Sequence, residues 1–122
     1  MVVKKIKPMF NRILTTMDKY KEDVMNDFGL IESGKASGTL KEYQRVVEVG
    51  TSVTTLKVGD IVCIDPTRYA APSHKHKDSV AGVMKDEVVT KYNFNTVDIE
   101  GVPHLLLYDS DITFVVVDHE GD

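Results

Sequence analysis

Residues 104–117 read His-Leu-Leu-Leu-Tyr-Asp-Ser-Asp-Ile-Thr-Phe-Val-Val-Val, two apolar runs on either side of a short polar turn. Apolar runs of this length, bounded by turn residues, are typical of β-strands. Asp109 and Asp111 favour the turn, because their short side chains can accept hydrogen bonds from nearby backbone N–H groups. The stretch therefore predicts two neighbouring strands, His104–Tyr108 and Ile112–Val117. Because the runs do not alternate with polar residues, we expect both faces to be buried, with a second subunit as one way of covering them.

The rest of the chain has the same pattern of short apolar runs separated by Gly, Pro, Ser and Asp. It contains 18 Val and 10 Thr but only 4 Ala, and β-branched residues suit pleated strands better than helices. Further strands are predicted at Phe10–Met17, Glu42–Val49, Asp60–Asp65, Glu87–Tyr92 and Phe94–Ile99. The predicted fold class is all-β, a small barrel or sandwich.

Length and charge limit the organisation of the chain. Its 122 residues carry 15 Lys and Arg against 19 Asp and Glu, a net charge of −4. A chain of this size can bury one hydrophobic core, so we expect a single domain over residues 1–122. The one cysteine, Cys63, excludes an internal disulfide and a cysteine-cluster zinc site. Because Cys63 lies in the apolar run Ile61–Ile64, we predict an inert thiol in the core.

The composition also limits the partners and the location. Nucleic-acid binding needs clustered Lys and Arg with interleaved aromatic rings, so this acidic chain without tryptophan is not expected to bind DNA or RNA. No stretch approaches the roughly 20 apolar residues of a membrane span. Residues 1–8 do not contain the apolar core of a signal peptide. We therefore expect a soluble, cytoplasmic protein without membrane contact.

Residues 18–38 interrupt the strand pattern with charges of alternating sign, followed by glycines and serines, and predict a long loop. One hypothesis is a mobile arm that presents the apolar sequence Phe28-Gly29-Leu30-Ile31 to a partner. The other is a loop whose apolar residues fold back on the barrel. A short amphipathic helix ending at Gly29 is a further alternative, because four apolar residues recur at near-helical spacing: Met17, Tyr20, Val24 and Phe28.

A second segment, about residues 66–95, is predicted to leave the barrel as an inserted excursion. It contains His74 and His76, which would share one face of an extended strand. Since no cysteine is near and the carboxylates are scattered, we expect a solvated basic loop and no metal site. His104 and His119 are isolated and are expected to be structural or exposed.

No motif in the sequence predicts catalysis or a cofactor. Residues 29–36 resemble a phosphate-binding P-loop, but Ala36 stands where the motif needs a hydroxyl, and Gly38 interrupts the helix that should follow. Asp109 and Asp111 are interpreted as local caps of their turn. The sequence indicates a binding or structural protein and not an enzyme.

Four segments, in order along the chain, are similar to the 10-kDa co-chaperonins, the GroES-like lids of chaperonin rings. Residues 6–14, Ile-Lys-Pro-Met-Phe-Asn-Arg-Ile-Leu, resemble the opening strand of that family. Gly29-Leu30-Ile31 stands where its mobile loop carries an apolar binding motif. Residues 46–50 and 57–62 resemble its central strands, and residues 109–116 resemble its closing strand.

The resemblance implies a small GroES-like β-barrel in a heptameric ring, whose loops insert apolar side chains into grooves of the chaperonin. Leu30 and Ile31 would occupy the groove, Gly29 would allow an unusual backbone angle, and Phe28 would add a contact. Loops that order only on binding have low individual affinity, which tethering in a ring converts into avidity. The implied function is a lid that assists protein folding while the chaperonin hydrolyses ATP.

The chain also departs from the pattern of this family. Glu32 takes the place of a third apolar residue in the loop, and Gln44 takes the place of a glycine before the central strand. The six residues between Gly50 and Lys57 are too few for the roof hairpin of typical members, a feature that some virus-encoded members share. Nothing in the family accounts for the long segment at about residues 66–95.

These departures support a second hypothesis, an auxiliary (decoration) protein of a viral capsid that reuses the barrel to bind capsid proteins. A virus-encoded lid would act in the host cytoplasm, and a decoration protein would be part of the virion. A homo-oligomer is expected in both cases. A barrel-type enzyme or small-molecule binder ranks last, because no polar cluster converges in the sequence.

Overall fold

The structure is a computed structural model that describes residues 1–32, 35–78 and 84–121, with the backbone alone for residues 72–78 and 84–90. Its strands are β1 (Arg12–Thr16), β2 (Tyr43–Val49), β3 (Ile61–Ile64), β4 (Ala70–Asp78), β5 (Met84–Tyr92), β6 (Thr96–Ile99), β7 (Val102–Tyr108) and β8 (Ile112–Val115). Among these residues there is no α-helix, so the helix considered around Tyr20 and Val24 is not formed. The chain is predominantly β, as its Val- and Thr-rich composition predicts.

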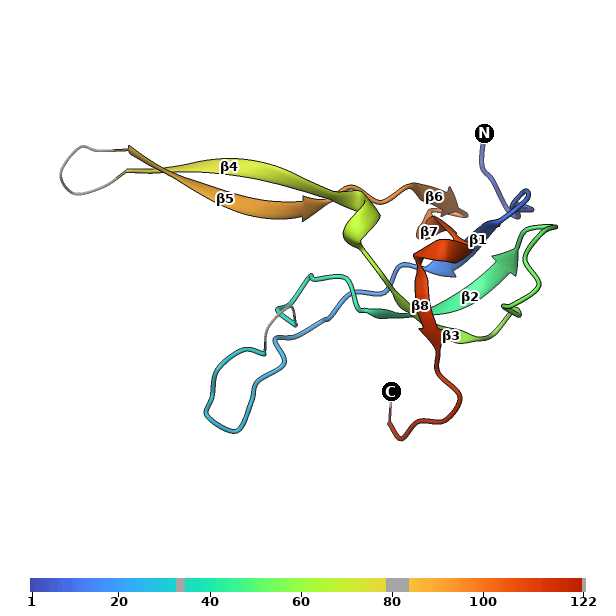
Figure 1. The fold of residues 1–122 in the computed structure, drawn as a ribbon, viewed down its shortest axis with the longest axis horizontal. Helices are drawn as coiled ribbons and strands as arrows, with labels where there is room; N and C mark the ends of the chain where they lie inside the picture. The colour runs from blue at the N-terminus through green and yellow to red at the C-terminus, as the bar shows by residue number, and fades with distance from the viewer. Residues whose placement is uncertain (33–34, 79–83, 122) are drawn as a thin grey trace.

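Six of the strands form one antiparallel sheet in the order β6-β7-β1-β2-β3-β8 (Figure 1). β1 lies in the middle, where Ile13 pairs with Leu107 of β7 on one side and with Val49 of β2 on the other. β6 and β8 stand at the two ends of the strand order. Each strand predicted from the sequence overlaps one of the observed strands, with ends that differ by a few residues.

The hydrophobic core lies on one face of this sheet. It follows the two-residue alternation of a strand: in β7, Leu105 and Leu107 are fully buried, whereas Leu106 between them is half-buried. Tyr69 from the 3-10 turn Thr67–Tyr69 completes the cluster. The core residues are Ile13, Val46, Val53, Leu56, Val62, Ile64, Tyr69, Leu105 and Leu107.

The other face of the closing strands is not buried within the chain. Phe114 of β8 is 48% exposed, and Val117, just beyond β8, is 95% exposed. The second face is therefore not covered within the single chain, and its burial against a second subunit stays a prediction. A continuous apolar run shows that both faces tolerate apolar residues, but it does not show that the chain has a second layer to cover them.

Cys63 is a second correction, because its side chain lies on the face of β3 opposite to the core. Val62 and Ile64 are buried, and the alternation of the strand places Cys63 on the outer face, where it is half-buried. Partial burial, followed by the charges of Glu42 and Asp65, raises the pKa of the Cys63 thiol. The thiol therefore stays protonated at neutral pH, as an inert cysteine would.

The segment predicted as an excursion holds a two-stranded antiparallel ribbon of β4 and β5, which projects away from the six-stranded sheet (Figure 1). The pairing runs from Ala70 opposite Tyr92 to Asp78 opposite Met84. The predicted strand Glu87–Tyr92 is part of β5, but β4 was expected to be a loop because its sequence is rich in Ser, His and Lys. His74 and His76 occupy β4 positions opposite Val88 and Asp86, and their side chains lie outside the described part of the structure.

Candidate functional site

The candidate site is an arm, residues 18–41, that connects β1 to β2 and extends away from the six-stranded sheet (Figure 1). Backbone hydrogen bonds join its two sides. The Lys41 amide donates to the Asp18 carbonyl at 2.9 Å, and the Tyr20 amide donates to the Thr39 carbonyl at 2.9 Å. The segment expected to be an irregular loop is therefore a hydrogen-bonded arm over its described residues.

The four residues predicted to bind a partner form the tip of this arm: Phe28, Gly29, Leu30 and Ile31. Phe28 is 88% exposed, Leu30 is 65% exposed and Ile31 is 47% exposed. Ile31 pairs with Met25 in an isolated antiparallel bridge, so the chain reverses direction between them. These side chains point into solvent and do not fold back on the sheet. Exposed apolar side chains gathered in one place make the tip a candidate surface for contact with another macromolecule.

Gly29 allows the reversal of the chain at the tip. Its φ of +76° lies in the left-handed region, which side-chain-bearing residues rarely adopt. No heavy atom lies within 4 Å of the place where a Cβ would stand. A substitution at Gly29 would therefore strain the backbone without causing a steric clash.

Glu32 ends the apolar sequence and lies on the returning side of the arm, where its backbone amide donates to the Val24 carbonyl at 2.7 Å. Its carboxylate forms an ion pair with the ammonium group of Lys35 at 3.0 Å. The hydrogen bond to Glu32 raises the pKa of Lys35. Because this pair is solvent-exposed, we assign it little stability.

The root of the arm is held by Gln44 of β2, a fully buried amide whose four hydrogen bonds join both sides of the arm. Its Oε1 accepts from the Thr16 hydroxyl at 2.8 Å and from the Asp18 amide at 2.9 Å. Its Nε2 donates to the carbonyl of Asp18 at 2.9 Å and to that of Lys41 at 2.8 Å. The sequence showed Gln44 only as a departure from a family pattern, and the one signal of its role was a polar residue at a buried strand position.

A second contact at the root joins Tyr20 to Glu42. The Tyr20 hydroxyl donates to the Glu42 carboxylate at 2.7 Å, and the ammonium group of Lys41 lies 5.6 Å from the centre of the Tyr20 ring. Burial, and next the hydrogen bond and charge of Glu42, raise the pKa of Tyr20 to about 12. The phenol is therefore a donor to Glu42 over the whole physiological pH range.

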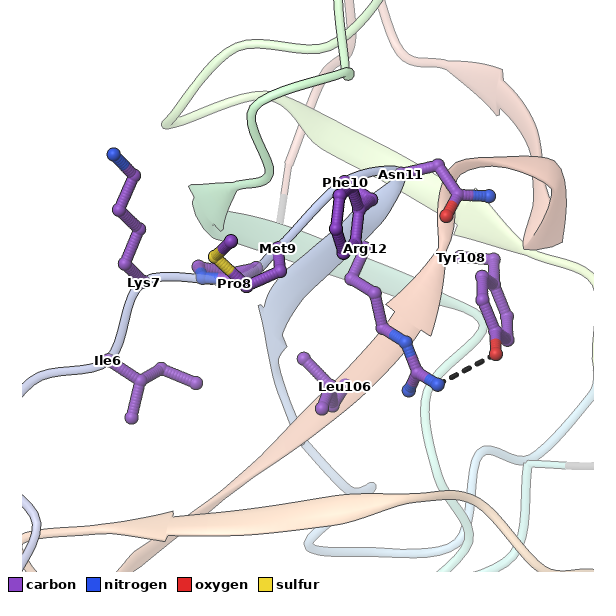
Figure 2. A pocket seen from close by; sticks show the side chains of 9 residues that line it. All are labelled: Ile6, Lys7, Pro8, Met9, Phe10, Asn11, Arg12, Leu106 and Tyr108. Atoms are coloured by element: carbon purple, nitrogen blue, oxygen red, sulfur yellow. Dashed lines mark hydrogen bonds between the residues drawn. The ribbon is translucent and has the colours of Figure 1, made fainter.

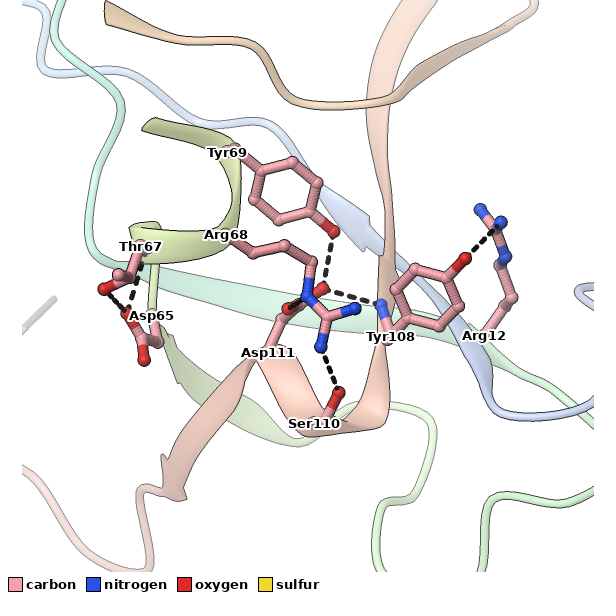
Figure 3. Close-up of polar contacts among 8 residues, drawn as sticks. All are labelled: Arg12, Asp65, Thr67, Arg68, Tyr69, Tyr108, Ser110 and Asp111. Atoms are coloured by element: carbon pink, nitrogen blue, oxygen red, sulfur yellow. Dashed lines mark hydrogen bonds and ion pairs between the residues drawn. The ribbon is translucent and has the colours of Figure 1, made fainter. Parts of the chain in front are cut away.

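The ribbon has its own root, built around the buried carboxylate of Asp111 (Figure 3). Asp111 accepts hydrogen bonds from the Tyr69 hydroxyl at 2.5 Å and the Tyr108 amide at 2.9 Å, and it pairs with the Arg68 guanidinium at 2.9 Å. Burial and the bond to Asp111 raise the pKa of Tyr69. The predicted role of Asp111 as a turn cap is confirmed by the Tyr108 bond, and its contacts to Arg68 and Tyr69 were not foreseen.

A shallow apolar pocket of about 480 Å³ lies beside the first residues of the chain (Figure 2). Pro8, Phe10 and Leu106 are among its lining residues. At its edge Arg12 donates to the Tyr108 hydroxyl at 2.7 Å, with its guanidinium 4.3 Å from the centre of the Tyr108 ring. The titratable side chains among its lining residues are those of Lys7, Arg12 and Tyr108.

The described residues contain no group of three or more His, Cys, Asp or Glu side chains that could hold a metal ion. His104 and His119 each contact only a neighbouring backbone carbonyl among the hydrogen bonds of this part of the chain. None of its helical segments has the length and apolar character needed to cross a membrane.

Comparisons with known proteins add no family assignment. No protein-family model matches the chain, and a search of curated proteins finds no match.

Proposed function

We propose that this protein is a co-chaperonin-like lid subunit, which binds a GroEL-like chaperonin ring through the tip of its arm and so assists protein folding. The observation that carries the proposal is the exposure of Phe28, Leu30 and Ile31 together at the end of an arm with an ordered root. Apolar side chains presented in this way suit an apolar groove on a partner. The role is binding, and it needs no cofactor and no catalytic residue in this chain.

A homo-oligomer is part of the proposal. Phe114, Val117 and Tyr43 leave an exposed apolar surface at and beside the sheet end formed by β8, and a second copy would cover it. The six-stranded sheet would then close as a GroES-like barrel in a ring. Several arms on one ring bind with avidity, which offsets a weak contact by each tip. Such a lid would act in the cytoplasm, or in the host cytoplasm if a virus encodes it.

The test is co-elution of the purified protein with a GroEL-like ring on size-exclusion chromatography, with ATP, with ADP and without nucleotide. The proposal predicts co-elution that depends on nucleotide. Elution apart from the ring under all three conditions would contradict it. Bovine serum albumin at the same concentration controls for nonspecific adsorption to the ring.

The ribbon of β4 and β5 favours a second candidate, an auxiliary protein of a viral capsid. It projects from the sheet to the same side as the arm (Figure 1), and the lid function gives it no role. In a capsid, the arm and the ribbon would both contact neighbouring capsid proteins, and the protein would be found in the virion. Stable binding to capsids, without affinity for a chaperonin, would favour this candidate.

A further inference from the structure

The tip of the arm is organised by one side chain, that of Asn26. Its Oδ1 accepts hydrogen bonds from the backbone amides of Phe28 at 2.9 Å and of Leu30 at 3.0 Å. The backbone of Asn26 completes the turn: its amide donates to the Leu30 carbonyl at 2.8 Å, and its carbonyl accepts from the Gly29 amide at 3.0 Å.

These four bonds bring the chain back to Asn26 after four residues. Asparagine is suited to the position, because its side-chain carbonyl can accept from N–H groups a few residues later in a tight turn. Exposed backbone amides would otherwise bond to water, and the turn would exchange between many conformations. Phe28 and Leu30 are therefore the residues whose backbone amides are bound by the Asn26 side chain, so this side chain also fixes where their apolar side chains begin.

We propose that Asn26 is a positioning residue that sets the conformation of the tip before any partner is bound. This inference rests on the proposed function, in which the tip of the arm is the binding site. A tip that is already ordered loses less conformational entropy on binding than a disordered loop, so each arm binds more tightly than a disordered loop with the same apolar contacts would. Asn26 itself makes no contact with the partner in this account.

The variants Asn26→Ala and Asn26→Asp separate the acceptor from the rest of the side chain. Alanine removes the acceptor, whereas aspartate keeps an oxygen in the same place. Asp27→Ala is the matched control, because the Asp27 side chain is next in the chain and takes no part in the bonds of this turn. Two quantities are measured on the full-length protein: amide hydrogen exchange of Phe28 and Leu30, and affinity for a GroEL-like ring with nucleotide.

Asn26→Ala is expected to speed exchange of the Phe28 and Leu30 amides about tenfold and to weaken binding about tenfold, because each amide loses its hydrogen bond to the side chain; a factor of ten corresponds to about 1.4 kcal/mol. Asn26→Asp and Asp27→Ala are both expected to keep the exchange rates and the affinity for the ring near the values of the unmodified protein. Unchanged exchange in Asn26→Ala, or equally fast exchange in all proteins, would overturn the proposal.

The two readouts also separate this inference from the proposed function. If the unmodified protein does not bind the ring, the proposed function fails, and the exchange measurement still decides whether Asn26 orders the tip. If the ring is bound and Asn26→Ala binds as tightly as the unmodified protein, the lid function stands and the positioning role of Asn26 is refuted.

Discussion

The side-chain amide of Gln44 forms two hydrogen bonds with the backbone of Asp18. The Gln44 Oε1 accepts from the Asp18 amide, and the Gln44 Nε2 donates to the Asp18 carbonyl, each at 2.9 Å. An amide side chain is the group that can make both bonds at once, because it carries an acceptor and a donor side by side. Asp18 is the first residue of the arm. The direction in which the arm leaves the sheet is therefore set by a buried side chain of β2.

Replacing Gln44 by leucine tests this role. Leucine has a similar size but leaves the Asp18 amide and the Lys41 carbonyl without their partner. We expect the free energy of unfolding to fall by about 1–3 kcal/mol, because the four hydrogen bonds of the buried Gln44 amide are lost. Urea denaturation measures the change, and Lys57→Ala, at an exposed position, serves as the control. Equal stability of Gln44→Leu and the unmodified protein would show that the hydrogen bonds are not needed.

Asp111 is expected to be the most sensitive carboxylate of the described part of the chain. Asp111→Ala leaves the Tyr69 hydroxyl and the Tyr108 amide without their acceptor. We expect it to lower the free energy of unfolding by about 2–3 kcal/mol, with a small share from Arg68, whose side chain is 53% exposed. Asp109→Ala, in the same turn, should change it by less than about 1 kcal/mol. Denaturant unfolding compares the two, and similar losses for both would contradict the assignment.

The raised pKa of Tyr20 predicts a loss of stability at alkaline pH. The unfolded chain releases the phenol proton near pH 10, whereas the folded protein keeps it until about pH 12. Between these values the folded state binds more protons, so this contribution is complete below pH 10 and is lost as the pH rises to 12. The tyrosinate absorbance of the protein and of Tyr20→Phe, titrated in parallel, isolates this group. A Tyr20 that titrates near pH 10 in the folded protein would refute the prediction.

The ribbon is expected to be dispensable for the folding of the six-stranded sheet. Ala71 and Lys91 are directly opposite one another, so residues 72–90 can be replaced by an Asn-Gly turn that joins them. This deletion keeps Arg68 and Tyr69 and their bonds to Asp111. We expect a single cooperative thermal transition within a few degrees of that of the full chain, and retained binding to a chaperonin ring.

Loss of the cooperative transition in the shortened protein would show that the ribbon belongs to the folding unit. A version with the same turn and with Tyr69→Phe is a useful comparison, since it removes the hydroxyl bond to Asp111 as well. It should be less stable than the shortened protein alone, because Asp111 then loses one of its donors.

The sequence predicted the β class and the position of most strands of the sheet, because the apolar runs and the Gly and Asp turns are local signals. It did not predict β4, since Ser, His and Lys residues have no strand pattern of their own and depend on pairing with β5. It misplaced Cys63 because an apolar run of four residues does not reveal which of its positions face the core.

In the candidate site, too, the sequence revealed some residues and not others. The apolar residues Phe28, Leu30 and Ile31 were visible as an exception within a polar segment. The residues that order the arm, Asn26 and Gln44, were not, because an Asn in a loop and a Gln in a strand are common and only their hydrogen-bond partners give them a role. Asp111 was identified as a turn cap, but its bond to Tyr69 spans 42 positions and has no local signature.

The double variant Leu30→Ser with Ile31→Ser tests whether the tip of the arm binds a chaperonin. Both side chains are exposed, so their replacement should leave the thermal unfolding temperature nearly unchanged. A large loss of stability would mean instead that they pack in a core, where such deletions cost about 2–5 kcal/mol each. Val58→Ser, at another exposed apolar position, controls for a general loss of surface hydrophobicity.

Native mass spectrometry of the protein mixed with a GroEL-like ring and nucleotide shows whether the tip of the arm binds a chaperonin. We expect an oligomer of the unmodified protein and of Val58→Ser to join the ring when nucleotide is present, and the Leu30→Ser, Ile31→Ser protein to form the same oligomer without joining the ring. Absence of any complex with the unmodified protein, or an equally abundant complex with the double variant, would contradict the claim that the tip of the arm binds a chaperonin.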